Sequence, residues 1–336
     1  MKSKLLSFLK YSLLLIVGLG LLWLTFKDQD LSEIFVKLTA ADPFWLGVSL
    51  VLSLAAYVSR AVRWVILIQP LGYKPRFSST LYALLVGYFA NLAIPRIGEI
   101  TRCGVLANSE KVPFHSLIGT VIVERVIDLI MLMISMMLVA FLEYDMLSRF
   151  LEEKVLGPMA GKFSILTSPV FWIALLIAGI VFVWMIIKFG KHSEHESKMI
   201  TRIRGLVSGV ASGFKTVLRM KNTGWFVFHT ILIWVIYFLM TWVCFFCLDA
   251  TSHLDMKAGM FVLVVGGLGM SAPVQGGIGA YHYIVSQGLQ LFGVSDTDGI
   301  VYATLVHTTQ TLLVVVLGLF ALFMIFLARK KSEAHG

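Results

Sequence analysis

Long apolar stretches alternate with short polar ones along most of this chain. A helix needs about 20 apolar residues to cross the hydrocarbon core of a bilayer. Strands of a transmembrane barrel would instead show alternating apolar and polar positions, whereas these stretches are continuous. The pattern predicts six transmembrane helices, over residues 5–26 (apolar from 11, extended by Leu5–Leu9), 44–68, 117–142, 169–187, 225–248 and 300–328.

Two further apolar stretches are too short to span, and each ends at a proline that glycine and polar residues follow. The first is Leu81–Pro95, which continues through Arg96 to Arg102, and the second is Phe261–Pro273, which continues to Gly279. Paired, interrupted hydrophobic segments in the two halves of a chain are typical of a transporter's binding site. Broken backbone at membrane depth must be buried in protein or line a wet cavity, so we predict an enclosed site.

The distribution of charge predicts how these segments are oriented. Cytoplasmic loops carry an excess of lysine and arginine, which places the basic segment 188–223 and both termini inside and the acidic segment 143–168 outside. Segment 80–116 then begins and ends inside, and segment 258–299 begins and ends outside. Each is therefore predicted to be a re-entrant hairpin, one entering from each side of the membrane.

The predicted fold is an all-α polytopic membrane protein with six full transmembrane helices and two oppositely oriented re-entrant hairpins, forming an inverted repeat. Each half contains two helices, a hairpin and a third helix. Residues 27–43 add an amphipathic interfacial helix. The first half covers 1–148 (5–26, 44–68, hairpin 80–116, 117–142), and the second covers 149–336 (169–187, 225–248, hairpin 258–299, 300–328), with the basic cytoplasmic loop 188–223.

Composition narrows the class of function. With 58% hydrophobic and 14% charged residues, the chain is not a soluble domain. Its three cysteines predict no disulfide framework. We find no nucleotide-binding loop, no cluster of metal ligands and no nucleophile triad in the sequence. We therefore expect no catalytic residues, no metal, no cofactor and no nucleic-acid partner, and hence a protein that is not an enzyme.

Ionisable residues inside apolar segments are costly and by default functional. Arg60 and Arg63 lie one helical turn apart, either to bind substrate or to reach the cytoplasmic headgroups. After Asn91, the residues Arg96, Glu99 and Arg102 recur every three positions and share one face if the segment is helical. Two guanidinium groups around one carboxylate suit a bound phosphate, although an ion pair that only locks the structure remains the alternative.

The other candidates fall into two groups. Glu124, Arg125 and Asp128 open the predicted helix 117–142, where they either pair with the hairpin arginines or relay protons or cations. The second hairpin offers glycines whose amides can approach an anion, and a histidine that titrates near neutral pH or is simply hydrogen-bonded. Its candidates are Gln275, Gly276, Gly277, Gly279 and His282, with His307 and Gln310 of the last helix as weaker ones.

Four motifs occur in order along the chain: Arg60-x-x-Arg63-Trp64, Asn91…Pro95-Arg96-x-Gly98-Glu99-x-x-Arg102, Glu124-Arg125-x-x-Asp128 and Pro273-x-x-Gly276-Gly277-x-Gly279. Together they resemble the lysylphosphatidylglycerol synthase transmembrane-region family of flippase-like membrane proteins, over nearly the whole chain. That family includes the lipid-flipping half of the multiple peptide resistance factor, which moves aminoacylated phosphatidylglycerol across the bacterial membrane.

The sequence departs from that family at two points. No stretch corresponds to a soluble aminoacyl-transferase domain, so lipid synthesis is not expected. The late family loop reads Pro-x-Pro-Gly-Gly-x-Gly with an acidic residue three positions on, whereas Gln275 and His282 stand at the second proline and at the acid. This difference indicates a subgroup with different substrate or proton handling.

The resemblance implies a lipid flippase or translocase. It would move an anionic or aminoacylated phospholipid, or a polyprenyl-phosphate-linked lipid, across the bacterial cytoplasmic membrane. Membrane lipids are its expected partners, and a homo-oligomer is compatible with the sequence. The alternatives are a small-solute or ion-coupled secondary transporter and an integral membrane lipid transferase, and the sequence leaves both open.

Overall fold

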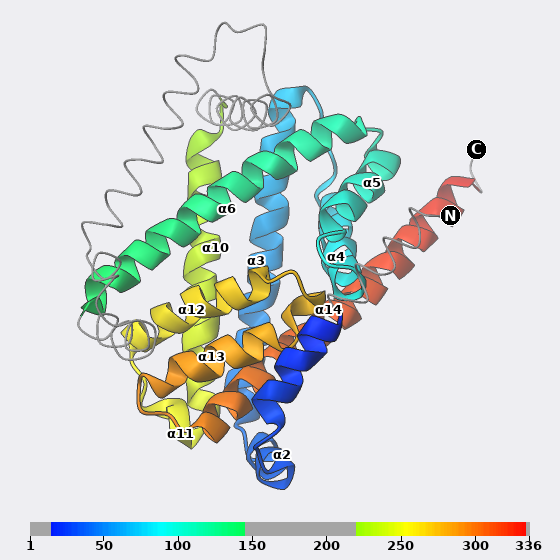
Figure 1. The fold of residues 1–336 in the computed structure, drawn as a ribbon. Helices are drawn as coiled ribbons and strands as arrows, with labels where there is room; N and C mark the ends of the chain where they lie inside the picture. Colours follow the sequence, from blue (N-terminus) through cyan, green and yellow to red (C-terminus); the bar gives the residue numbers. More distant parts are fainter. Residues whose placement is uncertain (1–14, 145–219, 334–336) are drawn as a thin grey trace, which may run out of the picture. The chain divides into compact units, whose positions relative to one another are not determined.

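The computed structural model describes residues 15–144 and 220–333, and these residues form helices and the turns that join them (Figure 1). The chain divides into two compact units, one made of Met1–Ile118 and Gly224–Gly336 and one of Gly119–Thr223. Helix α6 (Phe114–Leu142) lies mainly in the second unit. The first unit holds Leu15–Phe26, α2 (Leu31–Thr39), α3 (Pro43–Ile68), η1 (Gln69–Leu71), α4 (Phe77–Ala93), α5 (Gly98–Glu110), α10 (Thr223–Val243), η5 (Cys244–Cys247), α11 (Asp249–Ser252), α12 (Met256–Ser271), η6 (Gln275–Gly277), α13 (Ala280–Gln290) and α14 (Asp296–Glu333).

Within the described residues, four helices are long and apolar enough to cross a membrane. They run over Pro43–Leu71, Phe114–Leu142, Thr223–Cys247 and Asp296–Ala328, and they coincide with four of the six predicted helices. The predicted helix 169–187 and the loop 188–219 lie outside the described residues. The predicted helix 5–26 is described from residue 15 onward, as the apolar helix Leu15–Phe26. The protein is therefore a multi-pass, all-helical membrane protein in the part described.

The helix expected within 27–43 is α2. Its N-terminus is capped by Asp30, whose Oδ1 accepts a hydrogen bond from the backbone N–H of Ser32 at 2.8 Å, and a side-chain oxygen at this position satisfies one of the free amides of a helix start. Ile34 is buried on one face, whereas Phe35 on the other is exposed. The next helix, α3, begins in a similar way with Asp42 as its cap and proline at its first turn.

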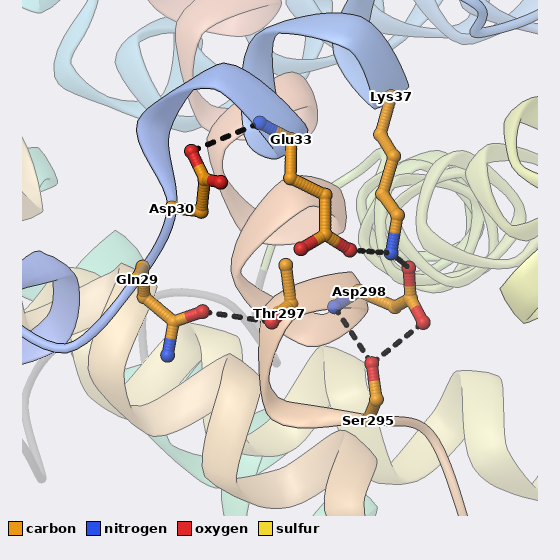
Figure 2. Close-up of polar contacts among 7 residues, drawn as sticks. All are labelled: Gln29, Asp30, Glu33, Lys37, Ser295, Thr297 and Asp298. Carbon is orange, nitrogen blue, oxygen red and sulfur yellow. Dashed lines mark hydrogen bonds and ion pairs between the residues drawn. The ribbon is translucent and has the colours of Figure 1, made fainter.

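Polar side chains join α2 to the start of α14, although the two are far apart in the sequence (Figure 2). The ammonium of Lys37 lies 2.7 Å from Asp298 Oδ1 and 2.8 Å from Glu33 Oε1. Thr297 donates a hydrogen bond to the amide oxygen of Gln29 at 2.8 Å, and Ser295 donates one to Asp298 at 2.6 Å. These contacts fix the segment that follows the first helix against the last one.

Replacing Lys37 should change how stability depends on pH. Hydrogen bonds to Asp298 and then to Glu33 raise the pKa of Lys37. A raised pKa stabilises the fold below the pKa of the unfolded lysine, and this contribution is lost as pH rises through the folded value. Between about pH 8 and about pH 11, we expect the melting temperature of the wild type to fall more than that of Lys37→Met. The effect on the free energy of unfolding should stay below about 1 kcal/mol because the pair is partly exposed. Equal losses in the two proteins would contradict this, and Lys74→Met, at an exposed position, is the control.

The first predicted hairpin is a pair of short helices, α4 and α5, which lie against each other (Figure 1). Helix α4 ends because Pro95 disfavours helical backbone at the residue before it, and Ile94 is extended, with φ −136°. Residue Arg96 then takes left-handed backbone, with φ 64°. The amide oxygen of Asn91, in the last turn of α4, accepts a hydrogen bond from the N–H of Gly98 at 2.7 Å. Asn91 thus caps α5 from the neighbouring helix.

The second predicted hairpin is the pair α12 and α13, also packed together (Figure 1). The connection 272–279 contains three glycines with left-handed backbone, Gly276, Gly277 and Gly279, at φ 56°, 75° and 79°. Glycine adopts this backbone without steric cost. We call residues 275–279 the glycine loop.

Candidate functional site

The turns of the two short helix pairs lie together. A β-carbon on Gly276 would lie 3.3 Å from the Leu92 side chain at the end of α4. The guanidinium of Arg96 donates a hydrogen bond to the carbonyl oxygen of Ser271 at 3.4 Å. Both contacts join segments of the first unit that are more than 170 positions apart. We call the place where residues 92–98 meet residues 271–279 the hairpin junction.

The three charged residues that follow Pro95 do not share one helical face. Arg96 is exposed and precedes α5, because its left-handed backbone falls outside the helix. Glu99 lies in the first turn of α5 and is half-buried, whereas Arg102 is buried. The guanidinium of Arg102 lies 4.5 Å from the centre of the Trp64 ring, a distance that allows a cation–π interaction. Of the two arginines, Arg96 is therefore the one that a ligand can reach in this conformation.

Arg60 and Arg63 of α3 are covered by protein. Arg60 is 8% exposed, and Arg63 is fully buried. Arg60 donates a hydrogen bond to the Tyr237 hydroxyl of α10 at 2.9 Å, and its guanidinium lies 5.4 Å from the centre of the Tyr88 ring of α4. The expected alternative, in which these arginines reach out to headgroups, does not describe this packing. Together with Arg102 they concentrate positive charge among α3, α4 and α5.

Three charged residues of α6, in the second unit, contact one another. Arg125 lies 3.3 Å from a carboxylate oxygen of Glu124 and 3.0 Å from one of Asp128. Glu124 is fully buried. These contacts bring together, within α6, the three charged residues that the sequence singled out.

The glycine loop touches the last helix through His307. Its ring nitrogen Nε2 lies 2.7 Å from the carbonyl oxygen of Gly276. The rings of His307 and His282 lie 4.8 Å apart, and both residues are buried. Gln275, beside them in the loop, is half-buried. His307 is one of the residues predicted from the sequence, and the structure places it directly against the loop.

Two features of the first unit were not predicted from the sequence. Gln310 of α14 bonds to Ser53 and Ser49 of α3 at 2.7 and 3.0 Å, which makes a polar contact between two apolar helices. The sequence feature that could have predicted this contact is the spacing of Ser49 and Ser53, which lie one helical turn apart. In addition, Gly279 packs directly against the backbone of Gly18 in the first helix.

A known protein family matches almost the whole chain, including the site residues described above. The profile of the family described as "Lysylphosphatidylglycerol synthase TM region" matches residues 11–318. The chain belongs to this family. All four motifs identified in the sequence fall within the matched range. The resemblance noted in the sequence is thus confirmed.

Two archaeal proteins are similar to this chain. The "UPF0104 membrane protein MJ1595" of Methanocaldococcus jannaschii is 22% identical over 280 residues, which is 79% of this chain and 83% of that protein. The "Glycosyltransferase AglD" of Haloferax volcanii is 28% identical over 102 residues, which is 30% of this chain but 16% of that protein. No solved structure gives a significant match. These names support a membrane protein whose family is connected with lipids.

Proposed function

We propose that this protein is a lipid flippase that moves lipids with an anionic or aminoacylated headgroup across the cytoplasmic membrane. The observation that carries the proposal is the hairpin junction, where the exposed Arg96 lies against the carbonyl of Ser271 beside a loop of left-handed glycines. Broken helices that meet inside a membrane protein are the usual position of a transported substrate. The headgroup would bind at this junction.

The chemistry of the junction suits a phosphate group. The guanidinium of Arg96 can bind two phosphate oxygens at once, and its present acceptor is a single neutral carbonyl at 3.4 Å. Successive backbone amides in a turn can form a concave site for an anion, and the glycine loop is such a turn, with Gly276 and Gly277 at positive φ. Buried Arg60, Arg63 and Arg102 would raise the positive potential there, and Glu99 would orient a guanidinium or receive an amine.

The acyl or prenyl tails would stay in the bilayer. Apolar side chains of α14 such as Leu312, Val316 and Phe323 are exposed and would face lipid. The two helix pairs would move against each other as the oppositely oriented re-entrant hairpins of an inverted repeat, with both termini in the cytoplasm. No bond needs to be made or broken for this movement, so we propose transport without catalysis.

The proposed substrates follow the family and its relatives. The family description names lysylphosphatidylglycerol, an aminoacylated phospholipid. The partial relative is named a glycosyltransferase, which keeps polyprenyl-phosphate-linked glycans among the lipids to test. Both classes carry phosphate next to a long apolar chain, the combination that the junction and the lipid-facing helices would accommodate.

Replacing Arg96 should reduce lipid movement. Flipping is measured in proteoliposomes, with fluorescent phosphatidylglycerol in one arm of the experiment and a fluorescent polyprenyl phosphate in the other. Arg96→Ala should slow flipping about tenfold or more, because an arginine bound to phosphate contributes more than about 1.5 kcal/mol of binding free energy. The matched control is Arg76→Ala. Arg76 lies at the other end of α4, where it is exposed and paired with Glu110, and its loss should leave the rate unchanged.

Other outcomes of this assay would support other functions. Full activity of Arg96→Ala with both lipids would reject the site. Uptake of a water-soluble solute, with no flipping of either lipid, would favour the small-solute transporter. Formation of a modified lipid by protein in detergent, where membrane sidedness is absent, would favour a transferase.

A further inference from the structure

A pair of buried histidines lies directly behind the glycine loop. His282 lies in the first turn of α13, just after this loop in the sequence, and His307 lies in α14. Their rings are inclined by 61° with centroids 4.8 Å apart, and the two residues are 5% and 8% exposed. Two imidazoles this close cannot both be charged at low cost, because like charges disfavour each other's charged form.

The hydrogen bonds of the pair indicate its protonation state. A carbonyl oxygen only accepts hydrogen bonds, so Nε2 of His307 carries the hydrogen that it donates to Gly276. Nδ1 of His282 is buried and has no hydrogen-bond partner among the described residues. Charging His282 would protonate both of its ring nitrogens, so Nδ1 would become a buried charged donor without an acceptor, which is far more costly than an unused lone pair.

The groups packed around the pair include few that titrate. Tyr281 of α13 lies 5.4 Å from the His307 ring, and the first helix presents the apolar ring of Phe26 to His282 at 6.4 Å. The glycine loop presents the Gly276 carbonyl, and α12 faces Tyr281 with Gly266 and Gly269. Farther out, the thiol of Cys244 follows α10, and Arg96 stands at the junction. No carboxylate is recorded in contact with either ring within residues 15–144 and 220–333.

We propose that His282 and His307 together bind one proton, and that the conformation described here is the proton-free state of this site. The inference rests on the proposed function in one respect, that the proton drives or gates lipid movement. Taking up a proton at His282 requires water or an acceptor at Nδ1, so it favours a different packing of the glycine loop. By linkage, whatever rearranges the loop also changes the affinity for the proton by the same factor.

This arrangement would couple a proton to the headgroup through a single loop. Gly276 offers its carbonyl to His307 and lies beside Leu92 of the first hairpin. A change at the histidines therefore reaches the junction without passing through another helix. The loop's amides and Arg96 would hold the headgroup in one state of the pair and release it in the other.

Histidine NMR tests the proton site without any lipid assay. Protein with labelled histidine is placed in nanodiscs and titrated between about pH 4 and about pH 8, and signals are assigned with His282→Gln and His307→Gln. We expect the two signals to change through one shared step in the wild type, and the remaining histidine to titrate alone in each variant. His253→Gln, at an exposed position outside the pair, should alter neither signal. Independent titration of the two histidines, or no titration over this range, would overturn the proposal.

Hydrogen exchange and transport then test the coupling. Hydrogen exchange of the backbone amides of residues 272–281, corrected for intrinsic rates, should become about tenfold faster at the lowest pH of the titration in the wild type. The same increase should not occur in His282→Gln. A pH gradient should accelerate flipping of fluorescent phosphatidylglycerol by the wild type, and His282→Gln should lose the acceleration. Shared titration with no flipping of any lipid would retain the proton site and reject the flippase. Flipping with no titration of the histidines would retain the flippase and reject the proton site.

Discussion

Gly98→Ala is expected to destabilise the first unit by about 3 kcal/mol, by forcing α4 away from α5. A β-carbon on Gly98 would overlap the carbonyl oxygen of Gly87 and lie 2.7 Å from the Asn91 amide, so both the close helix approach and the cap of α5 would be lost. The nearest atom in the way is the backbone carbonyl oxygen of Gly87, which cannot rotate aside. Thermal unfolding in detergent and flipping in proteoliposomes should both show the loss.

Gly104→Ala is the matched control for this substitution. It lies in the same helix, is exposed and would place its β-carbon in open space. In a helix interior, alanine is favoured over glycine by about 0.5–1 kcal/mol, so this variant should be slightly more stable than the wild type. Equal effects of the two substitutions would show that α4 and α5 do not touch through Gly98.

Gly279→Ala should produce the second large effect, through the first helix. Gly279 has φ 79°, and a β-carbon there would overlap the carbonyl oxygen of Gly18 and lie 2.7 Å from the N of Leu22. We expect a loss of about 3 kcal/mol or more, from backbone strain together with displacement of the Leu15–Phe26 helix. Because the glycine loop is part of the proposed headgroup site, flipping should fall as well.

Gly293→Ala separates the two causes. Gly293 has nearly the same φ, 80°, but open space around its β-carbon position. Its replacement should cost only the strain of left-handed backbone, about 1–2 kcal/mol, and should leave flipping intact. If both variants lost the same stability, the contact between the glycine loop and the first helix would not contribute.

The sequence predicted the elements better than their contacts. Pro95 and Pro273 predicted breaks that the structure shows, with α4 ending at Ala93 and α12 at Ser271, because proline restricts its own backbone and that of the residue before it. The last helix begins at Asp296 rather than 300. The polar residues 296–298 hid its first turn from a hydropathy pattern.

The arrangement of the site depended on long-range packing. Spacing suggested a shared face for Arg96, Glu99 and Arg102, but the left-handed backbone of Arg96 removes it from the helix. Nothing near His307 in the sequence indicates that it bonds to Gly276, 31 positions earlier. Such contacts follow from how helices pack, and neither propensity nor periodicity encodes them.

The contact between Lys37 and Asp298 bears on how the protein is made. The two residues are 261 positions apart, and the first unit is assembled from both ends of the chain. During synthesis, the first helices enter the membrane well before their partner α14 exists, since chains grow at about 5–20 residues per second. Early helices must therefore wait in lipid, with buried arginines such as Arg63 still lacking their final surroundings. Truncation before residue 296 should leave the first helices without their partner, so that cellular quality control degrades them. The last helix therefore decides whether the first ones persist.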